Sequence, residues 1–243
     1  MESSRNSCSG FEKGGEIMHM QNEGVLCNLK PLIELRMFAY GVLNRIFLEE
    51  PTRSFLQSLK ADHFLEFFPF QDEHPLIKQG IAVADQSLTD LDLERYEKIR
   101  WDYTRLFIGP HKIPTPPWES VYLNKERLIF QEETLNVRRA YLKYCLAPKN
   151  IGQEADDHLG YELDFMYQLC QLSLKNNEFI GSVLNDQKDF LENHILKWVP
   201  LICKDIFAHA KTDFYKGMAI CLEGFIEIDK KAVNELMDQI NVS

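Results

Sequence analysis

The sequence predicts an all-α fold: a helical bundle of roughly ten helices, in N-terminal and C-terminal parts joined by a hinge. Apolar residues recur at three- and four-residue spacing through most of the chain, which is the period of an amphipathic helix. No stretch between Leu26 and the end alternates convincingly between apolar and polar residues, as a half-buried strand would. Clusters of proline and glycine separate the periodic segments and mark helix ends.

Size and charge indicate a globular protein with an acidic surface. The chain has 243 residues, 45% of them hydrophobic and 26% charged, so it can form a sizeable core. Its formal net charge of −10 repels nucleic acid and anionic membranes and favours basic partners. The same charge could serve only to keep the protein soluble. We therefore expect no nucleic-acid partner, and the reason for the acidity stays open.

The cysteines and the N-terminus indicate the cellular compartment. No two of the six cysteines form a CxxC pair, and no His/Cys cluster has zinc-finger spacing, so no metal site is expected. Scattered thiols are typical of a reducing cytoplasm. We see neither a signal peptide nor an apolar run near the roughly 18 residues of a membrane span. A cytoplasmic location without stable membrane insertion is expected.

The first half of the chain divides into a tail and four helices. Residues 1–23 are rich in Ser, Gly and charge and predict a flexible tail, so that a single helical domain covers 24–243. Pro31 suits the first turn of a helix that ends near Glu50. Further helices are expected over residues 52–60, 75–88 and 92–108, with Thr52 and Asp92 as N-caps.

The second half contains longer helices. A helix over 131–146 is followed by a breaker cluster, which predicts a weak subdivision of the domain near 147–154. Three periodic segments come next, over 157–175, 179–199 and 211–240. We expect Pro200 to interrupt the chain between the last two. The final helix is expected to break near Ile228 and Asp229.

The most distinctive stretch runs from Trp101 to Leu123. It begins as a helix and stops at Gly109-Pro110, because glycine accepts a left-handed turn and proline cannot continue the ladder. The proline-rich segment that follows is stiff and poor in backbone donors, and it ends in Trp118 and Tyr122. A rigid loop carrying aromatic residues can form the wall of a groove. Trp118, Leu106 and Phe107 could also be ordinary core residues.

The second distinctive stretch is an acidic helix start, Glu154–Met166. Asp157 stands where an N-cap stands, while His158 lies one turn before Glu162. Gly160 would allow another backbone to approach closely. Carboxylates beside a histidine suit a basic peptide, since arginine pairs with carboxylates in bidentate fashion. The alternatives are a plain cap for Asp157 and a surface pair of His158 with Glu162.

Known catalytic and nucleotide-binding motifs are missing from the sequence. It contains no GxxxxGK[ST], no GxGxxG after a strand and no GxSxG. Basic residues do not alternate with aromatic ones, which argues against nucleic-acid binding. We therefore expect a binding protein rather than an enzyme.

Two stretches carry a resemblance to a known family: DYTRLFIGPHKIPTPPWESVYL and, downstream, DDHLGYELDFM. They resemble the TorD/DmsD family of redox-enzyme maturation chaperones, which are related to NarJ. The resemblance covers about residues 30 to 240. It implies cytoplasmic binding of the twin-arginine leader and the apo-catalytic subunit of a molybdenum-cofactor enzyme. The matched signal-peptide-binding positions are Tyr103, Leu106, Phe107, Gly109, Pro110, Pro117, Trp118, Asp157 and His158, to which we add Tyr122 and Glu162.

The resemblance also sets the expected division of labour. Leu106, Phe107, Trp118 and Tyr122 should supply most of the affinity by apolar burial, and Asp157 should select the arginines. His111, where many relatives carry an aromatic residue, and Ala155, which replaces a proline, depart from the family pattern. We expect no cofactor. The alternative is an enzyme assisting cofactor insertion, since some relatives bind GTP or a molybdenum-cofactor precursor. A monomer or a domain-exchanged dimer is possible.

Overall fold

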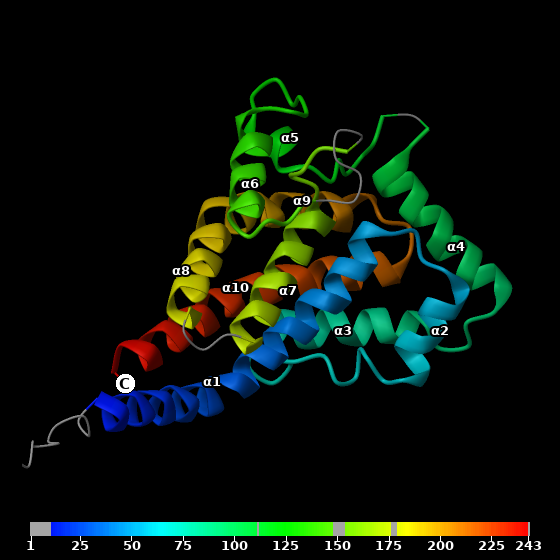
Figure 1. Cartoon of the computed structure of the whole chain (residues 1–243). Helices are drawn as coiled ribbons and strands as arrows, with labels where there is room; N and C mark the ends of the chain where they lie inside the picture. The colour runs from blue at the N-terminus through cyan, green and yellow to red at the C-terminus, as the bar shows by residue number, and fades with distance from the viewer. Residues whose placement is uncertain (1–10, 111, 148–153, 176–178, 243) are drawn as a thin grey trace, which may run out of the picture.

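The computed structural model describes residues 11–110, 112–147, 154–175 and 179–242, with side chains described between residues 28 and 240 in those ranges. Regular structure in these ranges is helical, which confirms the all-α prediction (Figure 1). The helices are α1 (Phe11–Leu48), α2 (Arg53–Ala61), α3 (Pro75–Ser87), α4 (Leu93–Tyr103), α5 (Glu119–Leu123), α6 (Glu132–Lys143), α7 (Leu159–Lys175), α8 (Ile180–Phe190), α9 (Leu196–His209) and α10 (Asp213–Val242). Two π-helical segments, η1 (Thr104–Ile108) and η2 (Leu191–Ile195), follow α4 and α8 directly.

Several helix ends follow the local sequence signals. The Thr52 hydroxyl accepts a hydrogen bond from the Phe55 N–H at 3.2 Å, and the Asp92 carboxylate accepts one from the Arg95 N–H at 2.8 Å. Both are therefore the N-caps that the sequence predicts. Gly109 ends η1 with a φ of 99°, a backbone conformation that glycine adopts without steric cost.

Helix α1 begins earlier than the sequence predicts. Its backbone is helical from Phe11, so Pro31 lies inside the helix instead of in its first turn, and part of the expected tail is helical. Residues 1–10 of that tail lie outside the described ranges. Residues 11–30 contain many good helix formers, and this propensity outweighs the missing apolar period. Pro31 is exposed, so water can bind the carbonyl that its missing N–H leaves unbonded. The first part of α1 extends away from the body of the molecule (Figure 1).

Two expected breaks in the C-terminal half are wrong. Pro200 lies inside α9, where it removes one intrahelical hydrogen bond, while the buried Val199 and Ile202 on either side of it keep the helix packed in the core. Helix α10 runs through Ile228 and Asp229 without interruption. Asp229 is fully buried and forms an ion pair with Arg36 of α1. The residue that the sequence suggests as a break in the helix is therefore part of the core. Residues 148–153, which include most of the predicted subdivision, lie outside the described ranges.

Helix packing places the end of α1 beside the start of α7. Helix α1 lies along α7, and α10 lies along α3. A Cβ atom on Gly160 would lie 2.5 Å from the Cβ of Leu48, so the close approach that the sequence predicts at Gly160 is made by α1 of the same chain. The side-chain amide of Asn44 also donates to the Gly160 carbonyl at 2.7 Å. No helix in the described ranges is long and apolar enough to cross a membrane.

Candidate functional site

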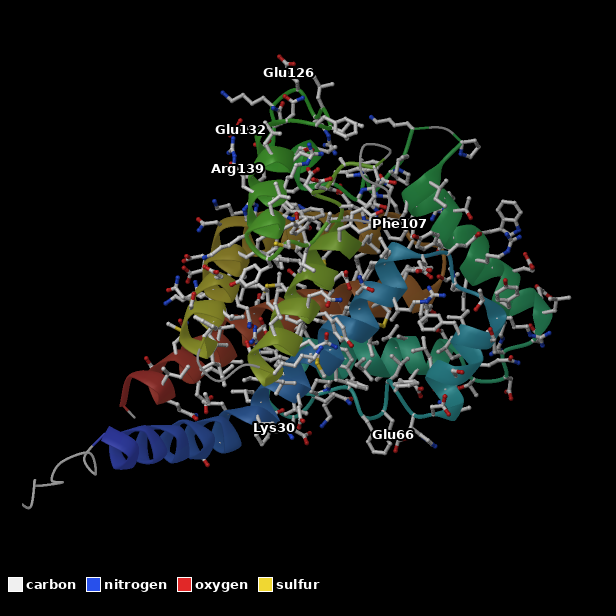
Figure 2. All side chains as sticks on the ribbon, viewed as in Figure 1. Lys30, Glu66, Phe107, Glu126, Glu132 and Arg139 are labelled. Carbon is white, nitrogen blue, oxygen red and sulfur yellow. The ribbon has the colours of Figure 1, made fainter. Side chains whose placement is uncertain are left out.

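The aromatic residues at the end of α4 and in η1 belong to the core. Tyr103, Leu106 and Phe107 are buried, and the Phe107 ring packs against Phe47 and Tyr215 at centroid distances of 6.2 and 5.9 Å. Figure 2 labels Phe107 near the C-terminal end of α1. Leu106 and Phe107 are therefore ordinary core residues, the alternative that the sequence leaves open, and they do not form an exposed apolar wall. The helical period correctly identifies their shared face, but that face packs against α1 and α10.

The loop after η1 folds back toward the helix that precedes it. The Thr115 hydroxyl donates to the Leu106 carbonyl at 2.7 Å, which holds the proline-rich segment close to η1. Gly109 is partly exposed and Pro110 is exposed at the start of this loop. His111, one of the two departures from the family pattern, lies outside the described ranges.

The two distinctive stretches of the sequence meet through their backbones. Trp118 and His158 form an isolated antiparallel β-bridge. The Glu119 N–H donates to the Asp157 carbonyl at 3.0 Å, and the Leu159 N–H donates to the Pro117 carbonyl at 2.8 Å. The rings of Trp118 and His158 meet edge to face, with centroids 6.1 Å apart. The predicted juxtaposition of the loop and the acidic helix start is therefore present.

Asp157 holds this junction together from the inside. Its carboxylate accepts hydrogen bonds from the Ser120 N–H and from the Thr134 hydroxyl, both at 2.8 Å, and the residue is 0% exposed. Asp157 thus caps the first turn of α5 and anchors α6, and it does not cap α7. Because the residue has no exposed surface in this arrangement, its carboxylate is not accessible to an arginine of a bound peptide. Asp156 is also buried and pairs with Arg138.

His158 is a buried, neutral histidine at the start of α7. Its Nδ1 accepts a hydrogen bond from the Gly160 N–H at 3.0 Å, so the ring proton is on Nε2. Burial lowers the pKa of His158 from 6.5 to about 4. The expected surface pair with Glu162 is wrong, because both side chains are buried and Glu162 bonds elsewhere. His158 is thus a hydrogen-bond donor without charge at neutral pH.

Glu162 and Tyr122 connect the site to α9. The Glu162 carboxyl group accepts a hydrogen bond from the Trp198 indole at 2.9 Å, and burial together with the nearby Glu119 raises its pKa well above the usual value. The half-buried Tyr122 packs against Trp198, with ring centroids 5.7 Å apart, and donates to Asp205 of α9. These two residues connect α5 and α7 to α9; Glu162 is fully buried, whereas Tyr122 keeps part of its surface exposed.

A cavity of about 630 Å³ opens beside the Trp118–His158 bridge. It lies between the end of α1, the start of α7 and the end of α6, and its polar lining includes Asn44, Glu49, Glu154, His158, Tyr161 and Asp164. Trp118 lies next to this lining, because its indole N–H donates to the carboxylate of the lining residue Glu154 at 3.0 Å. In the described ranges no group of three His, Cys, Asp or Glu residues could hold a metal ion.

Glu154 is the residue that the sequence reasoning missed. It precedes α7 by several residues and is half-buried, so it belongs to no helical face and has no period to identify it. Its position two residues before Asp156, in a stretch already rich in carboxylates, was the available signal.

Comparison with known proteins assigns the family. Residues 73–204, more than half of the chain, match the family described as the nitrate reductase delta subunit. The chain is 31% identical over 186 residues to "Probable Tat proofreading chaperone DmsD" of Haemophilus influenzae, covering 74% of this chain and 83% of that protein. This chain belongs to the TorD/DmsD family. It is also 25% identical to the "Chaperone protein TorD" of Aliivibrio salmonicida, covering 82% and 94%, and 27% identical to the "Tat proofreading chaperone DmsD" of Salmonella typhi, covering 73% and 80%.

Membership of the TorD/DmsD family confirms the resemblance drawn from the two sequence motifs. The matched segment 73–204 contains both stretches and therefore both sides of the Trp118–His158 bridge. In this TorD/DmsD chain the two motifs, the proline-rich loop and the start of α7, lie side by side next to the cavity.

Proposed function

We propose that this protein is a cytoplasmic, non-enzymatic chaperone that binds the twin-arginine leader and the apo-catalytic subunit of a molybdenum-cofactor oxidoreductase until cofactor insertion and export. The observation that carries the proposal is the cavity beside the Trp118–His158 bridge. This cavity lies where the two stretches that resemble the TorD/DmsD family meet, and relatives of this chain are named as Tat proofreading chaperones.

The cavity has the size and chemistry of a peptide site. Its volume of about 630 Å³ lies within the roughly 300–1,000 Å³ of ligand pockets and can hold one or two side chains of a leader. Glu49, Glu154 and Asp164 make its lining acidic, which favours a basic peptide and disfavours a phosphate-bearing nucleotide. The nucleotide- or cofactor-precursor-binding alternative is therefore not favoured.

The free energy of binding must come mainly from apolar contact. Micromolar capture needs about 8 kcal/mol, and ordering a disordered leader costs roughly 2–5 kcal/mol more. Exposed ion pairs contribute at most about 1 kcal/mol each. The apolar residues that remain accessible at the site are Trp118 and, in the cavity lining, Leu48 and Leu146. We expect these residues, in place of the buried Leu106 and Phe107, to pack against the leader.

Calorimetry on the intact chain tests the proposal. The probe is a synthetic peptide with an Arg-Arg pair followed by about ten apolar residues, the length of a leader's apolar region. We expect saturable micromolar binding, and no binding of a scrambled peptide of the same composition. No heat with the leader peptide, or equal binding of the scrambled one, would contradict the function. A melting temperature raised by GTP but unaffected by the leader peptide would favour the alternative.

A further inference from the structure

The cavity beside the Trp118–His158 bridge contains the carboxylate of Glu154, for which the described residues provide no cationic partner. Glu154 is half-buried, and the partner of its Oε1 is the neutral indole N–H of Trp118 at 3.0 Å. Its Oε2 has no hydrogen-bond donor among the described residues. By contrast, Glu49 in the same lining pairs with Arg45 at 3.3 Å. Burial raises the pKa of Glu154, which reflects a charge that the surroundings do not compensate.

A second polar atom at the same cavity, Nε2 of His158, has no hydrogen-bond partner among the described residues. His158 is about nine-tenths buried and lines the cavity, and its Nδ1 is occupied by the Gly160 N–H. The Nε2–H is therefore a donor with no acceptor among the described residues. A buried donor gains from an acceptor that a ligand brings, and a peptide carbonyl is such an acceptor.

These groups together match an arginine residue. A guanidinium can bond both oxygens of Glu154, since each carboxylate oxygen has two lone pairs and Oε1 can keep its bond to Trp118. The Trp118 ring borders the same carboxylate, and guanidinium groups also bind to aromatic faces. Lysine offers neither the planar fork nor the stacking and is more strongly hydrated. The site therefore has a physical reason to prefer arginine over lysine.

Building on the proposed function, we propose that Glu154 is the residue that selects arginine in the leader, while the His158 Nε2–H donates to a carbonyl of the leader backbone. Asp157, the carboxylate that the family pattern singles out, is then a positioning residue: it fixes α5 and hence Trp118, and it does not touch the leader.

The test compares two proteins with three peptides. The peptides carry Arg-Arg, Lys-Lys or Gln-Gln before the same apolar segment, and the proteins are the parent and Glu154→Gln, whose amide oxygen can still accept from Trp118. We expect Glu154→Gln to raise the dissociation constant of the Arg-Arg peptide at least about tenfold, because the variant loses one charge-assisted hydrogen-bonding contact. Binding of the Gln-Gln peptide should be unchanged.

The control variant is Glu66→Gln, which removes an equal charge. Glu66 is exposed, bonds His63, and lies at the opposite end of the molecule from α5 and α6 (Figures 1 and 2). The affinity of the Glu66→Gln protein for each of the three peptides should equal that of the parent protein. An equal loss for the Arg-Arg and Gln-Gln peptides in Glu154→Gln, or no loss, would overturn the assignment.

The parent protein alone keeps the proposal testable if Glu154→Gln does not fold. The parent should bind the Arg-Arg peptide about tenfold more tightly than the Lys-Lys peptide, and equal affinities would overturn the role of Glu154. If the parent binds the Arg-Arg peptide but shows no such preference, the inference fails and the chaperone function stands. If the parent binds no peptide, both fail.

Discussion

Trp118 and His158 are paired in one antiparallel bridge, although the helices α5 and α6 separate them in the chain. The bridge brings the proline-rich loop and the acidic helix start into direct contact, with the two rings 6.1 Å apart. The backbone bonds on either side of it fix the loop before α5 and the first residue of α7 at the same place. The position of the cavity follows from this junction.

Substitution of Asp157 should lower the stability of the fold, and it should affect peptide binding only through this loss of stability. Asp157→Ala leaves the buried Ser120 N–H and Thr134 hydroxyl without their acceptor, and we expect a loss of about 2–4 kcal/mol in the free energy of unfolding. Asp157→Asn should cost much less, because its oxygen can serve Ser120 while the Thr134 hydroxyl accepts from the amide. Urea unfolding measures both, and equal losses would contradict the capping role.

Leu106 and Phe107 should matter for folding. Leu106→Ala creates a cavity in the core and should cost about 2–5 kcal/mol in the free energy of unfolding. The folded fraction of this variant should bind the leader peptide as tightly as the parent does, since the side chain has no exposed surface. Unchanged stability together with lost peptide binding would show that Leu106 forms part of the binding surface after all.

His158 should make the protein less stable in mild acid. Its pKa is about 4 in the folded protein and about 6.5 in the unfolded chain, so above pH 6.5 neither state binds the proton and the stability is fully present. As the pH falls below 6.5 the unfolded state gains the proton first, and the loss should reach about 2–3 kcal/mol by pH 4.5.

His158→Asn removes this pH dependence while keeping an acceptor for the Gly160 N–H. The difference in unfolding free energy between the parent and this variant should therefore shrink or reverse between pH 7.5 and pH 4.5. Two parallel stability curves over that range would contradict a buried neutral histidine.

The buried ion pair of Arg36 and Asp229 should hold α1 against α10. The guanidinium Nε donates to Asp229 Oδ1 at 2.6 Å, and the Tyr40 hydroxyl donates to Oδ2 at 2.7 Å, with every partner fully buried. Asp229→Ala leaves an uncompensated charge and should cost about 3–5 kcal/mol. The double variant Arg36→Met/Asp229→Leu should recover much of this loss in urea unfolding. A double variant less stable than Asp229→Ala would contradict this account.

Local signals in the sequence predict the helical fold. The apolar period, the caps at Thr52 and Asp92 and the stop at Gly109 depend on neighbouring residues, and all of them are present in the structure. The breaks expected at Pro200 and Asp229 are wrong because distant parts of the chain override the local preference. Asp229 is stabilised inside α10 by Arg36, which lies in α1.

The site could be located from its motifs, but the roles within it could not. A helical period shows that Tyr103, Leu106 and Phe107 share a face, and only the packing of α1 and α10 shows that this face is covered. Likewise, the position of Asp157 just before α7 resembles that of an N-cap. Its hydrogen-bond partners, Ser120 and Thr134, are remote in sequence, so only the fold reveals them. Glu154 follows no helical period, and its place in the cavity lining is what distinguishes it from the neighbouring Asp156 and Asp157.

The most direct test of the central claim compares two tryptophans. Trp118 borders the cavity, whereas Trp101 is exposed on α4, at the edge of the molecule (Figure 1). In calorimetry with the Arg-Arg leader peptide, Trp118→Ala should weaken binding at least about tenfold, and Trp101→Ala should bind as the parent does. Equal affinities for the parent and Trp118→Ala, or a greater loss for Trp101→Ala, would place the leader elsewhere on the molecule and contradict the account.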